Sequence, residues 1–234
     1  MAALKGYIGG LETAIAMDSS AAVNVAANLE LMYTCSADLN GDNELSENET
    51  GLCDGDAHGI STDLEAKQAT FGDISGGKYI SGKIAGGDTS GQSTDWNVTG
   101  LVGWGDAEVI TPDALVRVWF EMISNNALSI ADGTFAQTPD GEDITKPYVT
   151  AEGHDLSQLV QKFLLGAVAF SQAADDYLDY DTIDAAGNDL VASKKGLYGD
   201  NSALKDGKNY TALEHGWDEG FGYFGAAKDY LAYT

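Results

Sequence analysis

The chain has 234 residues, and its 37 acidic and 12 basic side chains give a formal net charge of −25. This charge argues against a nucleic-acid partner, because phosphate binding needs clustered lysine and arginine, and Arg117 is the only arginine. It also disfavours adsorption to anionic membranes, whereas it is compatible with a cation-rich environment or with bound divalent metal.

Two helices are predicted at the start of the chain. Apolar residues recur every three or four positions over residues 3–17, which is the spacing of one helix face. Residues 18–20 then offer side chains of the helix-capping type, and a second helix is expected over about 21–34. The inner faces of these helices consist of Leu4, Tyr7, Ile8, Leu11 and Ile15, and of Val25, Leu29 and Met32.

The cysteines and the start of the chain bear on location. Cys35 and Cys53 are the only two cysteines, and they flank an acidic loop over residues 35–60. Two thiols in this arrangement predict a disulfide in an oxidising compartment, although two unrelated buried thiols are the alternative. No apolar run is long enough to span a bilayer, and no signal peptide is recognisable. The protein is therefore either cytosolic or exported with its signal removed. Because the cysteines favour the second alternative, we expect an exported protein of the periplasm or cell surface.

Residues 38–49 agree with the twelve-residue EF-hand loop. Ca²⁺ prefers six to eight oxygen ligands, which a tightly turned loop supplies from alternate positions. Asn43 stands where glycine usually allows the sharp turn, and asparagine tolerates that conformation better than most residues. We predict a single EF-hand-like loop that binds Ca²⁺ at about 10⁻⁴–10⁻³ M; the alternative is a solvated acidic turn. The predicted ligands are Asp38, Asn40, Asp42, Glu44, Ser46 and Glu49.

The middle of the chain alternates loops with two further helices. Residues 72–105 are rich in glycine and serine and predict a long irregular excursion. Thr111 as N-cap and Pro112 at the first helical position predict a helix start, and a loop follows over 129–150. A second helix should begin at Asp155 behind a capping-box-like sequence. Its apolar stripe comprises Leu156, Leu159, Val160, Phe163, Ala167, Phe170 and Ala174.

The last predicted helix spans about 211–232, after a polar loop over 179–210. It contains four glycines, each of which costs about 1 kcal/mol relative to alanine inside a helix, so tight packing must hold it. The expected fold is therefore mainly α: one helical domain over residues 1–234, described as a helix bundle with long irregular loops and a calcium-loop insertion at 35–60.

The final predicted helix carries a histidine with carboxylates at helical spacing. His215 lies three and four positions before Asp218 and Glu219, and these side chains with Glu214 form a face that could bind a transition metal such as iron or zinc. A further ligand would have to come from elsewhere, with His154 or Glu152 as candidates. The alternative is that a carboxylate only orients the imidazole. The aromatic residues on another face, Trp217, Phe221 and Phe224, are predicted to belong to the core.

Two segments of the chain carry a resemblance. Residues 156–172 and the Glu-His-Gly-Trp-Asp-Glu-Gly-Phe-Gly-Tyr-Phe-Gly sequence at 214–225 resemble a bacterial cell-envelope family of unknown function. Its members are often lipoproteins and are distantly similar to imelysins; residues 83–88 and 112–126 also fit. The resemblance implies an exported helical protein associated with iron-regulated or metal-uptake genes.

The chain also departs from these families. Imelysins carry a G-x-H-x-x-E motif, but here Leu213 and Asp218 replace the glycine and the glutamate, which argues against a metallopeptidase-like activity. Members of the resembled family continue beyond the signature, whereas this chain stops at Thr234. We therefore expect a short form or a fragment of a longer protein. The apolar face of the last helix would then need a partner chain or a second copy to cover it.

Three functions follow as hypotheses. The first is a non-enzymatic, calcium-binding protein that captures metal or another ligand at the cell envelope. The second is a metal-dependent hydrolase that uses His215 with Asp218 or Glu219, although a catalytic metal usually needs about three protein ligands. The third is a calcium-dependent adhesive or assembly protein, in which the glycine- and serine-rich excursion contacts a neighbouring molecule.

Overall fold

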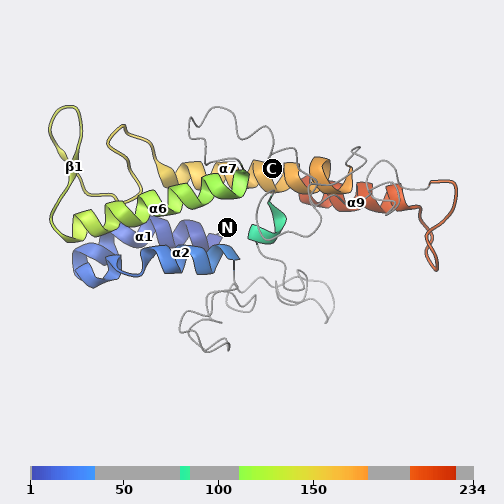
Figure 1. Cartoon of the computed structure of the whole chain (residues 1–234), viewed down its shortest axis with the longest axis horizontal. Helices are drawn as coiled ribbons and strands as arrows, with labels where there is room; N and C mark the ends of the chain where they lie inside the picture. Colours follow the sequence, from blue (N-terminus) through green and yellow to red (C-terminus); the bar gives the residue numbers. More distant parts are fainter. Residues whose placement is uncertain (1, 35–79, 85–110, 179–200, 225–234) are drawn as a thin grey trace, which may run out of the picture. The chain divides into compact units, whose positions relative to one another are not determined.

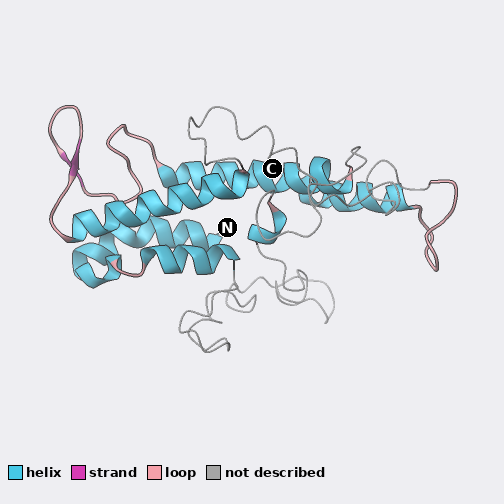
Figure 2. Ribbon diagram, in the orientation of Figure 1, coloured by secondary structure: helices cyan, strands magenta, loops and turns pink. Residues whose placement is uncertain are grey.

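The computed structural model describes residues 2–34, 80–84, 111–178 and 201–224. Helices dominate these ranges, and a two-stranded hairpin is the sheet found among them (Figures 1 and 2). The predicted mainly α fold class is therefore confirmed. The predicted calcium loop, both cysteines and most of the glycine- and serine-rich excursion lie outside the described residues.

The chain divides into two compact units. The first combines residues 1–82 with 116–162, and the second combines 83–115 with 163–234. The helices over 112–131 and 156–172 each contribute residues to both units. The division therefore does not test the predicted single domain over 1–234, which stays a prediction. Within the described ranges, no helix is both long enough and apolar enough to cross a bilayer.

The first unit begins with helix α1 (Ala2–Met17), the 3₁₀ turn η1 (Ser19–Ala22) and helix α2 (Val25–Thr34). Asp18 caps η1, because its Oδ1 accepts the Ser20 N–H at 2.9 Å, as the capping-type sequence predicted. Hydrogen bonds from the side chain and the backbone N–H of Ser20 hold the pKa of Asp18 below its usual value. Four of the five residues of the predicted inner face of α1 are buried, namely Leu4, Ile8, Leu11 and Ile15, and Tyr7 is half-buried.

Side chains of α1 and α6 (Pro112–Ala131) both contact α2, and Figure 1 shows these helices side by side in the first unit. The Asn28 side-chain N–H donates to Tyr7 Oη at 3.0 Å, and burial raises the pKa of that phenol. The rings of Tyr33 and Phe120 meet edge to face with centroids 5.5 Å apart. The core of this unit is therefore built between α2 and its two neighbours.

Helix α6 starts where the sequence predicted, because Thr111 Oγ1 accepts the Ala114 N–H at 3.1 Å. The segment that follows, predicted to be loop, contains an antiparallel hairpin of β1 (Ala136–Gln137) and β2 (Asp143–Ile144). Strands of two residues are too short to show a two-residue alternation. The turn between them places Gly141 at a φ of +85°, a conformation that glycine adopts without steric cost.

Helix α7 (Leu156–Gln172) begins behind its predicted cap, since Asp155 Oδ1 accepts the Gln158 N–H at 3.0 Å. Its apolar stripe is narrower than predicted. Leu156, Val160 and Leu164 are buried, whereas Phe170 is 53 % exposed and Leu159 is also exposed. The helix then continues into a π-helical turn, η4 (Ala173–Tyr177). The wider turn changes which residues face inward, so simple 3.6-residue spacing fails near this end.

Candidate functional site

Helix α9 (Ala212–Phe224) in the second unit carries the predicted metal face, and a capping box fixes its start. The Thr211 N–H donates to Glu214 Oε2 at 2.7 Å, and the Glu214 N–H donates to Thr211 Oγ1 at 3.3 Å. These bonds satisfy two backbone donors at the helix N-terminus. Hydrogen bonds that the Glu214 carboxylate accepts from the backbone N–H and the side chain of Thr211 lower the pKa of Glu214. The Thr-x-x-Glu sequence at 211–214 is the signal of this cap, which was not among the predicted helix starts.

Helix α9 packs closely against η4 through two of its glycines. A Cβ atom at Gly216 would lie 2.9 Å from the Tyr177 carbonyl oxygen, and one at Gly220 would lie 3.4 Å from Ala173 Cα. Side-chain atoms at the first position would therefore force the backbones apart. This contact is the tight packing that the glycine content of the segment predicted.

Aromatic rings and a lysine extend this contact within the second unit. The rings of Tyr177 and Tyr223 stack with centroids 6.0 Å apart. Lys83, in the 3₁₀ turn η3 (Ser81–Lys83), places its Nζ 5.5 Å from the centroid of the Tyr223 ring. The same ammonium donates to Oε1 of the buried Gln172 at 3.1 Å. These contacts join Lys83, the end of α7 and α9.

The prediction that Trp217 and Phe221 belong to the core is wrong. Their side chains are 60 % and 48 % exposed. The glycine face of α9 makes the contact with η4, and residues one and five positions after Gly216 therefore turn away from it. The prediction for Phe224 stays a prediction, because its side chain is not among those that the structure describes.

The polar face of α9 brings His215 and Glu219 together. The distance from His215 Nε2 to Glu219 Oε2 is 3.5 Å, and each side chain is 36 % exposed. The imidazole also stacks on the Tyr210 ring, with centroids 4.9 Å apart and an interplanar angle of 15°. The histidine is thus held between an aromatic ring and a carboxylate, while Asp218 is exposed beside them. Glu214, the other predicted ligand, is engaged in the cap through Oε2.

Two further candidate ligands, His154 and Glu152, belong to a different unit from α9. His154 and Glu152 lie exposed in the turn before α7, in the first unit, where Thr150 Oγ1 accepts the His154 N–H at 3.2 Å. Hydrogen bonds to a backbone N–H and to Thr150 lower the pKa of Glu152. Among the described residues, no group of three histidine, cysteine or acidic side chains is arranged to hold a metal. The calcium-loop residues 38–49 fall outside the described ranges.

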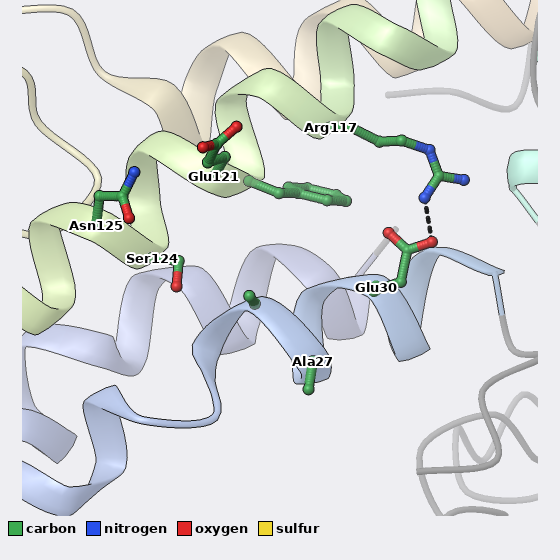
Figure 3. A pocket seen from close by; sticks show the side chains of 8 residues that line it. Ala27, Glu30, Arg117, Glu121, Ser124 and Asn125 are labelled. Carbon is green, nitrogen blue, oxygen red and sulfur yellow. Dashed lines mark hydrogen bonds and ion pairs between the residues drawn. The ribbon is translucent and has the colours of Figure 1, made fainter. Parts of the chain in front are cut away.

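A groove between α2 and α6 in the first unit is a second candidate site, and no sequence motif predicted it. Its volume is about 440 Å³, and at one end Arg117 forms an ion pair with Glu30 (Figure 3). The arginine also lies over the Tyr33 ring, with its Cζ 5.4 Å from the ring centroid. The lining residues are Ala26, Ala27, Glu30, Arg117, Phe120, Glu121, Ser124 and Asn125.

Comparison with known proteins gives a family but no function. No curated protein and no solved structure matches the chain. One family matches residues 109–232, and its description is a domain of unknown function. This range contains α6, the hairpin, α7, η4 and α9, and therefore the polar face with His215 and the Arg117 end of the groove. Because the match covers more than half of the sequence, the chain belongs to the DUF4856 family.

Proposed function

We propose that the chain is an exported, non-enzymatic protein of the bacterial cell envelope that captures a transition-metal ion on α9 and binds Ca²⁺ through the loop at 38–49. The observation that carries the capture function is the pairing of His215 with Glu219 on one exposed helix face. The resemblance of residues 214–225 to an envelope family distantly similar to imelysins supports the location. The spacing of oxygen-bearing residues over 38–49 supports the calcium site.

The geometry of the pair suits a shared metal ion. Zn²⁺ binds imidazole nitrogen and carboxylate oxygen at about 2.0–2.2 Å, so neighbouring donors of a tetrahedral site lie roughly 3.4 Å apart. The separation of 3.5 Å between His215 Nε2 and Glu219 Oε2 is close to this value. An ion could therefore bind both atoms with little movement of either side chain, and the Tyr210 stack limits the rotation of the imidazole.

Two protein donors leave several coordination positions for water or for a second ligand. Asp218 is exposed next to the pair and is available as a further oxygen donor. An open, exposed site suits reversible capture better than a structural role, since structural zinc sites are closed by four protein ligands. Nitrogen and oxygen donors follow the Irving–Williams order, so Cu²⁺ should bind more tightly than Ni²⁺ or Zn²⁺.

The test is a titration of the purified chain with Cu²⁺ and Zn²⁺ by calorimetry, comparing wild type, His215→Ala and His154→Ala. His154 is the matched control, because it is exposed and distant in sequence from the α9 face. We expect His215→Ala to remove the tightest Cu²⁺ site and His154→Ala to retain it. Equal loss in both variants, or unchanged binding in His215→Ala, would contradict the proposed capture site.

A second candidate function, assembly with a partner chain or a second copy, is favoured by the exposed rings of Trp217 and Phe221. Large apolar side chains exposed close together are typical of interaction surfaces. Sedimentation of the same His215→Ala preparation distinguishes the two functions. Self-association that depends on Ca²⁺ and persists without the histidine supports assembly, whereas a monomer with its metal site abolished supports capture.

A further inference from the structure

The groove between α2 and α6 is independent of the metal face, because every residue that lines it belongs to the first unit. Its volume of about 440 Å³ falls in the range of small-molecule sites, which is roughly 300–1,000 Å³. Figure 3 shows Ser124 and Asn125 on α6 toward one end and the ion pair of Glu30 with Arg117 at the other. The groove therefore has two polar ends.

The part between these ends is apolar. Ala26 precedes Glu30 by one helical turn and so lies on the same face of α2, and it lines the groove together with Ala27 and Phe120. Larger side chains at the two alanines would occupy the space that their methyl groups leave open. Phe120 is only 4 % exposed, so its ring is held in place by the core and only a small part of it faces the groove. An occupant should accordingly have an apolar body.

The charges at the groove favour a cationic occupant over an anionic one. Arg117 is the chain's only arginine, but Glu30 neutralises it and the Tyr33 ring lies beneath it. Glu121 is exposed at the rim, and none of the described residues forms an ion pair with it. The groove thus carries two carboxylates and one guanidinium, on a chain whose net charge is −25. Both the local and the global charge attract cations.

We propose that this groove binds a small organic cation with an apolar body, such as an aromatic or aliphatic amine. The body lies against Ala26 and Phe120, and the ammonium group lies at the rim near Glu121. Asn125, exposed one helical turn further along α6, supplies a further oxygen acceptor. The metal proposal does not involve this site, and the family match assigns no function to it. A negative result would therefore leave both unaffected.

The experiment is an NMR titration of the ¹⁵N-labelled full chain with phenethylamine, 2-phenylethanol and phenylacetate, which share a ring and differ in charge. Saturable shifts with phenethylamine are expected at amides of residues 26–30 and 120–125. The neutral alcohol should bind more weakly, and phenylacetate should bind least. Glu121→Gln should weaken phenethylamine binding by up to about fivefold, the range of an exposed ion pair.

Two variants separate binding in the groove from general attraction to an acidic surface. Glu142→Gln removes the same charge from the exposed hairpin turn and should leave the affinity unchanged. Ala26→Leu fills the groove at an exposed position, where the fold should tolerate it, and should abolish the shifts. The proposal is overturned if phenylacetate binds as tightly as the amine, if the shifts lie elsewhere, or if they persist in a folded Ala26→Leu protein.

Discussion

Glu214 shows how one side chain can have two interpretations at the scale of the residue. In the sequence it stands beside His215 and before Asp218, a pattern typical of a metal-binding face. In the structure its Oε2 accepts the Thr211 N–H and completes a capping box. The capping interaction joins residues three positions apart, so the Thr-x-x-Glu spacing is enough to predict it. Whether a carboxylate also binds metal depends on where other donors lie, and spacing along one helix does not determine this.

The Glu214 cap makes the stability of α9 sensitive to acid. The folded-state pKa of Glu214 lies below its usual value of 4.5, because its carboxylate accepts hydrogen bonds from Thr211. Its contribution is therefore present above pH 4.5 and is lost as the pH falls through the lowered folded-state pKa. We expect Glu214→Gln to reduce the loss of α9 helicity between pH 5 and pH 3.

Circular dichroism and hydrogen exchange of the α9 amides measure this loss. Glu142→Gln is the matched control, since Glu142 is exposed in the hairpin and the same charge is removed. The account is wrong on this point if both variants retain the acid sensitivity of the wild type.

At the scale of the element, the contact between α9 and η4 explains why a helix can carry so many glycines. Gly216 and Gly220 allow the two backbones to approach, whereas a Cβ at Gly222 would meet nothing within 4 Å. Two glycines therefore serve packing, and the third makes no comparable close approach in the structure. Each of the three glycines lowers helix propensity relative to alanine. At Gly216 and Gly220 the close contact with η4 offsets this cost.

Alanine substitutions should separate these roles. Gly216→Ala should destabilise the protein by about 1–3 kcal/mol, the range for overpacking, because its methyl group meets the Tyr177 carbonyl oxygen. Gly222→Ala should instead stabilise it by up to about 1 kcal/mol through better helix propensity. Urea unfolding followed by circular dichroism measures both. Stabilisation by both substitutions would show that the close contact with η4 does not constrain α9.

Helix positions could be predicted from the sequence because their signals are local. Each cap involves residues no more than three positions apart in the sequence. The structure confirms the caps predicted at Thr111 and at Asp155. Burial was less predictable where it depends on a partner element. Phe170 is exposed close to the point where α7 passes into a π-helical turn. Trp217 is exposed because the glycines of α9, and not its aromatic rings, face η4. The groove between α2 and α6 joins residues about 90 positions apart, so no local pattern contained it.

At the scale of the whole molecule, a charge of −25 on 234 residues favours cations at several places. The chain belongs to a family of unknown function, and the proposals assign three cation classes to it. Ca²⁺ is proposed for the 38–49 loop, a transition metal for α9, and an organic cation for the groove. The His215–Glu219 pair is central, because its donor atoms already have the separation that a shared metal requires.

The most direct test of that claim is anomalous X-ray scattering from crystals of the full chain grown with Cu²⁺ and without chelators. The account predicts an anomalous peak within about 2.0–2.2 Å of both His215 Nε2 and a carboxylate oxygen of Glu219, and no peak there in His215→Ala. A metal bound elsewhere, with the α9 face empty at saturating Cu²⁺, would contradict it.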